Sequence, residues 1–380
     1  MVEKVYFKNL HGFRFFAAAL VMLSHIELFK KRVGLHNLWD TPFFFEAGSA
    51  GVDFFFVLSG FLITTLLLKE QERTGTIDLR KFYMRRILRI WPLYYLIVIV
   101  CYFIVPLIRA FYIAGYSEII YESFFPKLLY SVFFMPNVAL SLFEEIPYAA
   151  PLWSVGVEEQ FYLFWPLLLL GFPKKLRLIS GFILLFIGIK ACFILFNSIF
   201  HLDKIWFEKI KNLLVATRME CMGIGGLGAY LLYKKHWIGE VLKSNGAMAV
   251  VLFFLPFTIW FSKFLFEMHH IVLAILFLIV IINGATNSRT PLKLENKTFL
   301  MLGNISYGLY LWHSICIGLV INFLRHNEFF MVNTVLLNLA LYVGTFSISI
   351  LIAWLSYGFF ETPFLNLKRK FSVIISGAKT

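Results

Sequence analysis

The sequence predicts an all-α polytopic membrane protein in which about ten transmembrane helices cross the bilayer. Of its 380 residues, 60% are hydrophobic and only 15% are charged, whereas about 25% of a soluble domain is charged. The apolar residues gather in runs of about 20, the length of helix that crosses roughly 30 Å of hydrocarbon. The chain also holds 45 Phe, 17 Tyr and 9 Trp, as lipid-facing surfaces and interfacial belts do.

The apolar runs define the expected spans. No internal repeat and no Gly/Ser-rich or Pro-rich linker marks off a second domain, so we expect a single transmembrane domain over residues 1–380. The expected spans are residues 10–29, 43–68, 90–108, 151–170, 176–197, 213–233, 245–263, 267–284, 298–323 and 331–360.

The basic residues predict the orientation, because cytoplasmic loops carry an excess of Lys and Arg. With the N- and C-termini cytoplasmic, inner segments hold 22 of the 35 Lys and Arg, seven of them in the basic inner loop of residues 69–90. Residues 128–143 are apolar enough for an eleventh span, but that span would turn 13 downstream inner basic residues outward. Pro136 and Pro147 also favour a re-entrant or interfacial piece. We therefore expect residues 109–150 to form the largest outer loop.

Charge and cysteine content exclude several other classes. The net charge of +13 does not indicate nucleic-acid binding, because the basic residues lie between apolar runs. The cysteines show no C-x-x-C spacing, so the sequence predicts neither a zinc site nor a redox dithiol, and no metal. They are Cys101, Cys192, Cys221 and Cys316. The N-terminus does not resemble a cleavable signal peptide, since its apolar run contains Arg14 and His25.

Arg14 and His25 both lie in the first expected span, where ionisable side chains are costly. They are eleven residues apart, almost three helical turns, so both project from one face about 16 Å apart along the axis. Alone, Arg14 fits a snorkelling side chain near the inner interface, and His25 fits a hydrogen-bonded packing residue. Together they favour a functional path along this face, with Arg14 near the inner end and His25 in the outer half.

Carboxylates lie at a similar expected depth in two other spans. Asp53 and the Glu158–Glu159 pair are expected in the outer half, as His25 is. A carboxylate near a His sets its tautomer and stabilises its charged form, which is the layout of a general base acting on a hydroxyl. We therefore predict catalytic roles for Asp53 and Glu158. The alternative is that these carboxylates only neutralise bundle charges such as Arg218.

Arg85, Arg86 and Arg89 crowd the inner end of the third span. Arg86 and Arg89 share a helical face at i, i+3, and Arg binds phosphate oxygens with paired N–H donors. With Arg14, they predict a site for an anionic cytoplasmic cofactor. The alternative is ordinary positive-inside topology or lipid head-group binding.

Two mid-span polar residues are weaker candidates. Ser59, which precedes Gly60, is assigned to the cofactor side, with helix packing as the alternative. His313 is either structural or pore-lining.

These motifs, in this order, resemble those of the membrane acyltransferase-3 family. The matching segments are Arg14-x10-His25, Phe-Phe-Val-Leu-Ser-Gly-Phe at 55–61, Phe82-Tyr-x-Arg-Arg-x-x-Arg-Ile-x-Pro-Leu-Tyr94, Leu152-Trp-Ser-x-x-Val-Glu-Glu-Gln-Phe-Tyr162, Ile305-Ser-Tyr-Gly-Leu-Tyr-Leu-Trp-His313 and Glu361-x-Pro363. The resemblance covers nearly the whole chain. Each motif alone is degenerate, but the set in register is specific.

The resemblance implies an enzyme that moves an acyl group, often acetyl, from cytoplasmic acyl-CoA to a hydroxyl of a cell-envelope carbohydrate or glycolipid. Members of the family acylate lipopolysaccharide O-antigens, peptidoglycan, exopolysaccharides and small glycolipids. By the matching motifs, His25 is the catalytic His, Arg14 its motif partner, and Arg86 and Arg89 the R-x-x-R pair on the cofactor side. Some relatives add an esterase-like domain with a Ser-His-Asp set, which we expect this chain to lack.

Residues and resemblance agree on a mechanism. The phosphates of acyl-CoA (acetyl-CoA) meet Arg86, Arg89 and Arg14, the pantetheine arm threads toward His25, and an acceptor hydroxyl attacks from the outer side. Direct transfer and an acyl-His intermediate both stay open. We expect a multi-pass protein of the bacterial cytoplasmic (inner) membrane with acyl-CoA, an envelope polysaccharide or glycolipid and membrane lipid as partners, but no nucleic acid. The competing hypothesis is a transporter of an envelope precursor that uses the buried charges as a proton relay, although no inverted repeat supports it.

Overall fold

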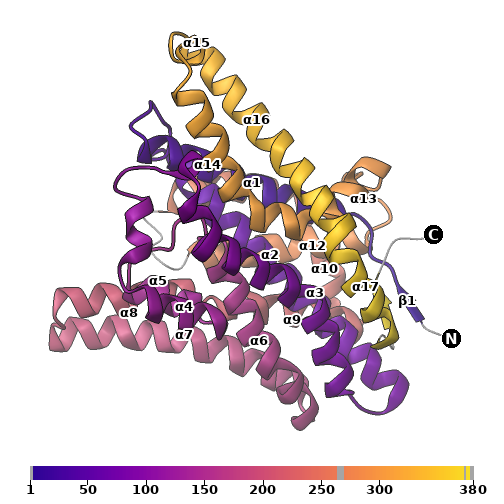
Figure 1. Ribbon diagram of the computed structural model, residues 1–380. Coiled ribbons are helices and arrows are strands. Elements are labelled where there is room, and N and C mark those ends of the chain that lie inside the picture. Colours follow the sequence, from indigo (N-terminus) through magenta and orange to yellow (C-terminus); the bar gives the residue numbers. More distant parts are fainter. Residues whose placement is uncertain (1–2, 263–268, 372–373, 377–380) are drawn as a thin grey trace.

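The protein is a bundle of helices, described by a computed structural model over residues 3–262, 269–371 and 374–376 (Figure 1). The long helices are α1 (Leu10–Arg32), α2 (Pro42–Thr74), α3 (Leu79–Ile99), α6 (Leu152–Gly171), α7 (Lys175–Phe200), α9 (Met219–Tyr233), α11 (Asn245–Trp260), α12 (His269–Thr286), α14 (Ser306–Arg325) and α16 (Thr334–Leu355). Shorter α-helices are α4 (Phe124–Val132), α5 (Pro136–Leu142), α8 (Lys204–Ala216), α10 (Trp237–Leu242), α13 (Lys297–Asn304), α15 (Glu328–Met331) and α17 (Thr362–Lys368).

Short π-helices, short 3₁₀-helices and two short strands make up the remaining regular structure that the structure describes. The π-helices are η1 (Val100–Ile104) and η7 (Ser356–Glu361). The 3₁₀-helices are η2 (Val105–Leu107), η3 (Arg109–Phe111), η4 (Ser117–Tyr121) and η8 (Arg369–Phe371). Strand β1 (Glu3–Val5) pairs in parallel with β2 (Ile374–Ser376), with Glu3 opposite Ile374.

Within the described residues, seven helical stretches are long and apolar enough to cross a membrane, which confirms the prediction of a helical multi-pass membrane protein. They are Leu10–Arg32, Pro42–Thr74, Leu79–Leu107, Lys175–Phe200, His269–Thr286, Ser306–Arg325 and Thr334–Phe371. Each of the other three expected spans also contains a long helix, namely α6, α9 and α11. α9 and α11 have only 15 and 16 residues, while α6 contains consecutive polar residues at 158–160. The number of ten spans and the orientation stay predictions.

Several expected boundaries were wrong. Residues 298–323 are split at Ile305 into α13 and α14, and the last span changes to π-helix after Leu355. The third helix begins at Leu79 rather than at residue 90, because its first turns are charged and hydropathy alone assigns them to a loop. Residue 263 of the seventh expected span and residues 267–268 of the eighth lie outside the described residues.

The segment expected to be the largest outer loop, residues 109–150, folds into short helices. α4 and α5 occupy most of residues 128–143, and they have nine and seven residues, too few to cross a bilayer. The segment packs on the C-terminal end of α1. The ring centroid of Tyr148 lies 5.7 Å from that of Phe29, and Arg32 forms an ion pair with Glu145.

Helix α2 lies at the centre of the bundle. Of its most apolar window, 78% is buried, against 6% for α7, so α2 is core and α7 presents apolar surface outward, as a lipid-facing helix does. Figure 1 shows α7 and α8 side by side at one edge, where the Phe193 and Phe207 rings stack with centroids 5.4 Å apart.

The backbones of α2 and α9 touch. A Cβ placed on Gly60 would collide with the backbone carbonyl of Met222, and one on Gly225 would collide with the carbonyl of Val57. Small residues permit this close approach between membrane helices, where van der Waals packing replaces the hydrophobic driving force. The contact explains why a glycine follows Ser59 in the middle of a span.

Helix α3 is anchored at its charged end. The backbone N–H of Lys81 donates to the Asp78 carboxylate at 3.0 Å, an N-cap interaction that lowers the pKa of Asp78 below its usual value. Farther along, Arg85 donates to Glu70 of α2 at 2.8 Å. These two contacts fix the helical face that carries the other arginines.

Candidate active site

One cavity of the bundle has a volume of about 400 Å³ and is rich in basic side chains. They come from the N-terminal end of α1, the first half of α3 and the C-terminal end of α17 with η8. These basic lining residues are His11, Arg14, Arg86, Arg89, Lys368 and Arg369. We call this cavity the basic pocket.

Helical periodicity brings the α3 arginines together. Arg86 and Arg89 lie at i, i+3 on one face, and both line the basic pocket. The guanidinium of Arg86 lies 5.9 Å from the ring centroid of Tyr162, but its buried Nε has no hydrogen-bond partner among the described residues. A buried N–H without a partner needs an explanation in a folded protein, and an anionic ligand would supply one.

Glu158 places a carboxylate in the wall of the pocket. Ser59 of α2 donates to its Oε1 at 2.9 Å, and Tyr162 donates to its Oε2 at 3.0 Å. The neighbouring Glu159 accepts a hydrogen bond from the Trp91 indole N–H at 2.8 Å. Thus Ser59 and Glu158, predicted separately, are bonded to each other and line the same pocket.

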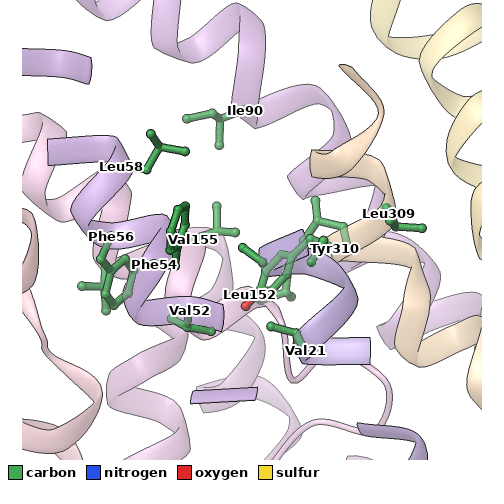
Figure 2. Close-up of a cluster of buried hydrophobic side chains, with 14 of the residues drawn as sticks. Val21, Val52, Phe54, Phe56, Leu58, Ile90, Leu152, Val155, Leu309 and Tyr310 are labelled. Carbon is green, nitrogen blue, oxygen red and sulfur yellow. The ribbon is translucent and has the colours of Figure 1, made fainter. Parts of the chain in front are cut away.

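The opposite end of the pocket is largely apolar. Val52 and Tyr310 are part of its lining, and Figure 2 shows them gathered with Val21 and Leu152 in a cluster of buried side chains. The Tyr310 hydroxyl lies 2.6 Å from the Ser154 hydroxyl. One turn beyond Val21 on α1 is the predicted catalytic residue His25, which is not itself part of the pocket lining.

His25 is hydrogen-bonded to another histidine. Its Nδ1 lies 2.8 Å from Nε2 of His313 on α14, and the two rings stack with centroids 5.0 Å apart. His313 is fully buried, and its Nδ1 lies 2.5 Å from the backbone carbonyl oxygen of Tyr310. The helix that supplies Tyr310 to the pocket therefore also supplies the partner of His25.

Asp53 faces a different part of the bundle. It is fully buried, and its oxygens contact Arg218 Nη1 at 2.9 Å and His270 Nδ1 at 2.8 Å. Consecutive helical residues point about 100° apart, so Val52 can face the pocket while Asp53 faces α9 and α12. The structure does not place Asp53 against His25.

Arg85 is also directed away from the basic pocket. Besides its 2.8 Å contact with Glu70, it donates to the carbonyl of Phe371 at 3.0 Å, and it is not part of the pocket lining. Arg85 therefore ties α2, α3 and η8 together, while Arg86 and Arg89 face the cavity.

Sequence reasoning did not assign several residues of the site. Lys368 and Arg369 were only two of the 22 basic residues assigned to inner segments. Ser154 and Tyr310 lay inside the matching motifs and had no stated role. His313 was singled out as polar and mid-span, yet its partner could not be found because it lies 288 residues away in the chain. Among the described residues, no group of three or more His, Cys, Asp or Glu could hold a metal ion.

Taken together, the structure is that of a helical membrane protein with a basic cavity and a histidine pair that is linked to the cavity through Tyr310. A family model described as an acyltransferase domain, that of the acyltransferase-3 family, matches residues 7–354. The chain belongs to this family.

Curated relatives are similar over nearly the whole chain. A protein of Staphylococcus aureus (strain COL) with the provisional name O-acetyltransferase is 27% identical over 94% of this chain and 57% of its own length. The peptidoglycan O-acetyltransferase OatA of Listeria monocytogenes is 26% identical over 95% of this chain and 56% of its own. The O-acetyltransferase OatA of S. aureus (strain NCTC 8325) is 26% identical over 96% and 58%. The chain thus spans little more than half the length of these relatives, and no solved structure matches it.

Proposed function

We propose that this chain is a membrane O-acyltransferase that moves an acetyl group from cytoplasmic acetyl-CoA to a hydroxyl of a cell-envelope carbohydrate or glycolipid. The observation that carries the proposal is one cavity whose lining holds Arg14, Arg86 and Arg89 and also Tyr310. The backbone carbonyl of Tyr310 contacts His313, which is the hydrogen-bond partner of His25. Family membership and relatives named as O-acetyltransferases support the same chemistry.

The basic end suits the phosphates of a coenzyme A thioester. Arg guanidinium groups bind phosphate oxygens through paired N–H donors, and the unpartnered Nε of Arg86 offers one such donor. In this proposal Arg14, Arg86 and Arg89 bind the donor directly, Ser59 acts through Glu158, and Arg85 supports the arginine-bearing helix. The apolar end then receives the uncharged part of the donor.

His25 acts as the general base in this proposal. The acceptor hydroxyl gives its proton to His25, its oxygen bonds to the acyl carbon, and the carbon–sulfur bond breaks. The sulfur leaves with the bonding electron pair and takes the proton back from His25, so an ester and a free coenzyme A thiol are the products. Arg14 and Glu158 complete the predicted catalytic set, and the role of Asp53 is tested separately below.

The proposed topology places the two substrates on opposite sides. With ten spans and cytoplasmic termini in the bacterial inner membrane, the N-terminal end of α1 and the first half of α3 face the cytoplasm. The basic pocket then opens to cytoplasmic acyl-CoA, while His25 lies nearer the outer surface and its glycan or glycolipid acceptor. We propose residues 1–380 as one transmembrane acyltransferase domain.

The test measures transfer of labelled acetyl groups from acetyl-CoA to envelope glycan or glycolipid in membranes that contain the full chain. We expect the parent to transfer label and His25→Gln to lose activity by at least 100-fold, the low end for a general base. His36→Gln is the matched control, because His36 is exposed. No transfer by the parent, combined with flux of an envelope precursor in vesicles, would support a transporter instead.

A further inference from the structure

The hydrogen bonds around His313 determine which nitrogen of His25 carries a proton. A backbone carbonyl oxygen only accepts, so the 2.5 Å contact between Tyr310 O and His313 Nδ1 requires a proton on that Nδ1. In neutral His313 the other nitrogen, Nε2, is then an acceptor. The Ser314 hydroxyl, 3.4 Å from this Nε2, is compatible with that assignment because it can donate.

The same logic continues into His25. Its Nδ1 lies 2.8 Å from the acceptor Nε2 of His313, so Nδ1 of His25 must carry a proton and donate it. A neutral His25 then has its lone pair on Nε2. Among the described residues Nε2 of His25 has no protein hydrogen-bond partner, which leaves it available to a substrate.

We propose that His313 is a positioning residue that holds His25 in the tautomer with Nδ1 protonated and thereby presents Nε2 as the base for the acceptor hydroxyl. This inference rests on the proposed function of His25. Histidines in catalytic and metal sites take their tautomer and orientation from the partner of the other ring nitrogen. Here that partner is an imidazole held by a helix carbonyl, in place of the carboxylate that is common in such sites.

The arrangement works in both charge states of His25. When Nε2 takes the acceptor proton, His25 becomes an imidazolium whose Nδ1–H still donates to His313, so the hydrogen bond persists throughout the reaction. When Nε2 returns the proton to the leaving sulfur, the starting tautomer is restored. A neutral partner also avoids a second buried charge in the bundle, which would carry a desolvation cost.

The kinetic test compares two substitutions at His313 in the full chain. In His313→Gln the amide oxygen can accept from His25 Nδ1 near the position of the lost Nε2, whereas His313→Leu offers no acceptor. We expect His313→Leu to lower kcat on the order of 10- to 100-fold, as losing a residue that orients a histidine does in metal sites. KM for the donor should change little, and His313→Gln should recover most of kcat.

Cys316→Ala is the matched control, because Cys316 is buried on the same helix α14 and is not part of the site. Parental kcat in His313→Leu would overturn the proposal, as would equal losses in the Gln and Leu variants. A parent without transferase activity, or a fully active His25→Gln variant, would refute the proposed function of His25 instead.

A second measurement does not depend on activity. In chain labelled with ¹⁵N-histidine and reconstituted in lipid, the ring-nitrogen shifts report which nitrogen is protonated. We expect His25, assigned by the signal lost in His25→Gln, to show a protonated Nδ1 and an unprotonated Nε2. We also expect His313→Leu to give a mixture of tautomers at His25. The opposite tautomer in the parent would overturn the proposal.

Discussion

Ser59 donates a 2.9 Å hydrogen bond to Glu158, which joins α2 to α6 in the wall of the basic pocket. Tyr162 donates a hydrogen bond to the other carboxylate oxygen of Glu158 at 3.0 Å. With both oxygens held, the carboxylate has a fixed place among the positive charges of Arg14 and Arg86, its electrostatic neighbours. Glu158 therefore controls both the shape and the charge balance of the pocket.

Replacing Glu158 tests this relationship. We expect Glu158→Ala to lower kcat/KM at least tenfold, because a hydrogen bond to a charged group contributes about 1.5–3 kcal/mol and about 1.4 kcal/mol is tenfold. Ser59→Ala removes only one of the two donors and should lower kcat/KM less. Steady-state acetyl transfer checks both, and an unchanged kcat/KM in Glu158→Ala would contradict the role.

Arg89 should contribute to donor binding rather than to chemistry. We expect Arg89→Gln to raise KM for acetyl-CoA by about tenfold, the effect of losing one charge-assisted hydrogen bond, while kcat stays near the parental value. Lys81→Gln is the control, since Lys81 lies on the same helix but is exposed and outside the pocket. A lower kcat with unchanged KM would place Arg89 in the chemical step instead.

Substitutions at Asp53 test whether its role is catalytic or structural. Asp53→Asn removes the charge that pairs with buried Arg218, so we expect it to destabilise the fold by about 3–5 kcal/mol. Thermal unfolding in detergent measures the loss. The double variant Asp53→Leu/Arg218→Met removes both charges and should recover stability. If it also recovers acetyl transfer, Asp53 is structural; if it folds and is inactive, the predicted catalytic role stands.

The glycine contacts between α2 and α9 give a prediction about folding. We expect Gly225→Val to reduce the yield of folded protein sharply, because its side chain would overlap the carbonyl of Val57 and force the two helices apart. Gly188→Ala on α7 is the control, since nothing lies within 4 Å of its Cβ position. There alanine should be neutral or stabilising by up to about 1 kcal/mol. Size-exclusion profiles and unfolding temperatures compare the two.

Hydropathy was sufficient to predict a helical multi-pass membrane protein, because a bilayer requires long apolar helices. They could not predict which buried groups meet. Asp53 was expected near His25 from depth alone, but depth does not fix the direction of a side chain around its helix. Its partner His270 lies 217 residues away in the chain, and His25 pairs with His313 instead. Such pairings depend on the packing of distant helices.

The shared face of Arg86 and Arg89 was predicted more successfully, because their spacing is local. The i, i+3 relation of Arg86 and Arg89 needs only one helix, and both face the cavity. Arg85 has the same charge at the adjacent position, yet it pairs with Glu70 of α2. The sequence did not reveal this contact between two helices. Lys368 was missed as a pocket residue because it follows a π-helical turn, which changes the angular relation of later residues to those before it.

The backbone contact of α2 with α9 also constrains how the pocket can change volume. Two helices that touch through their backbones cannot be moved closer together by rotating side chains, so this wall is mechanically stiff. The wall that carries Lys368 differs, since α16 runs into the π-helix η7 before the chain reaches Lys368. Because Arg85 holds α3 to α2, loading and release of a ligand as long as coenzyme A should bend this wall at η7 while α2 and α3 stay in place.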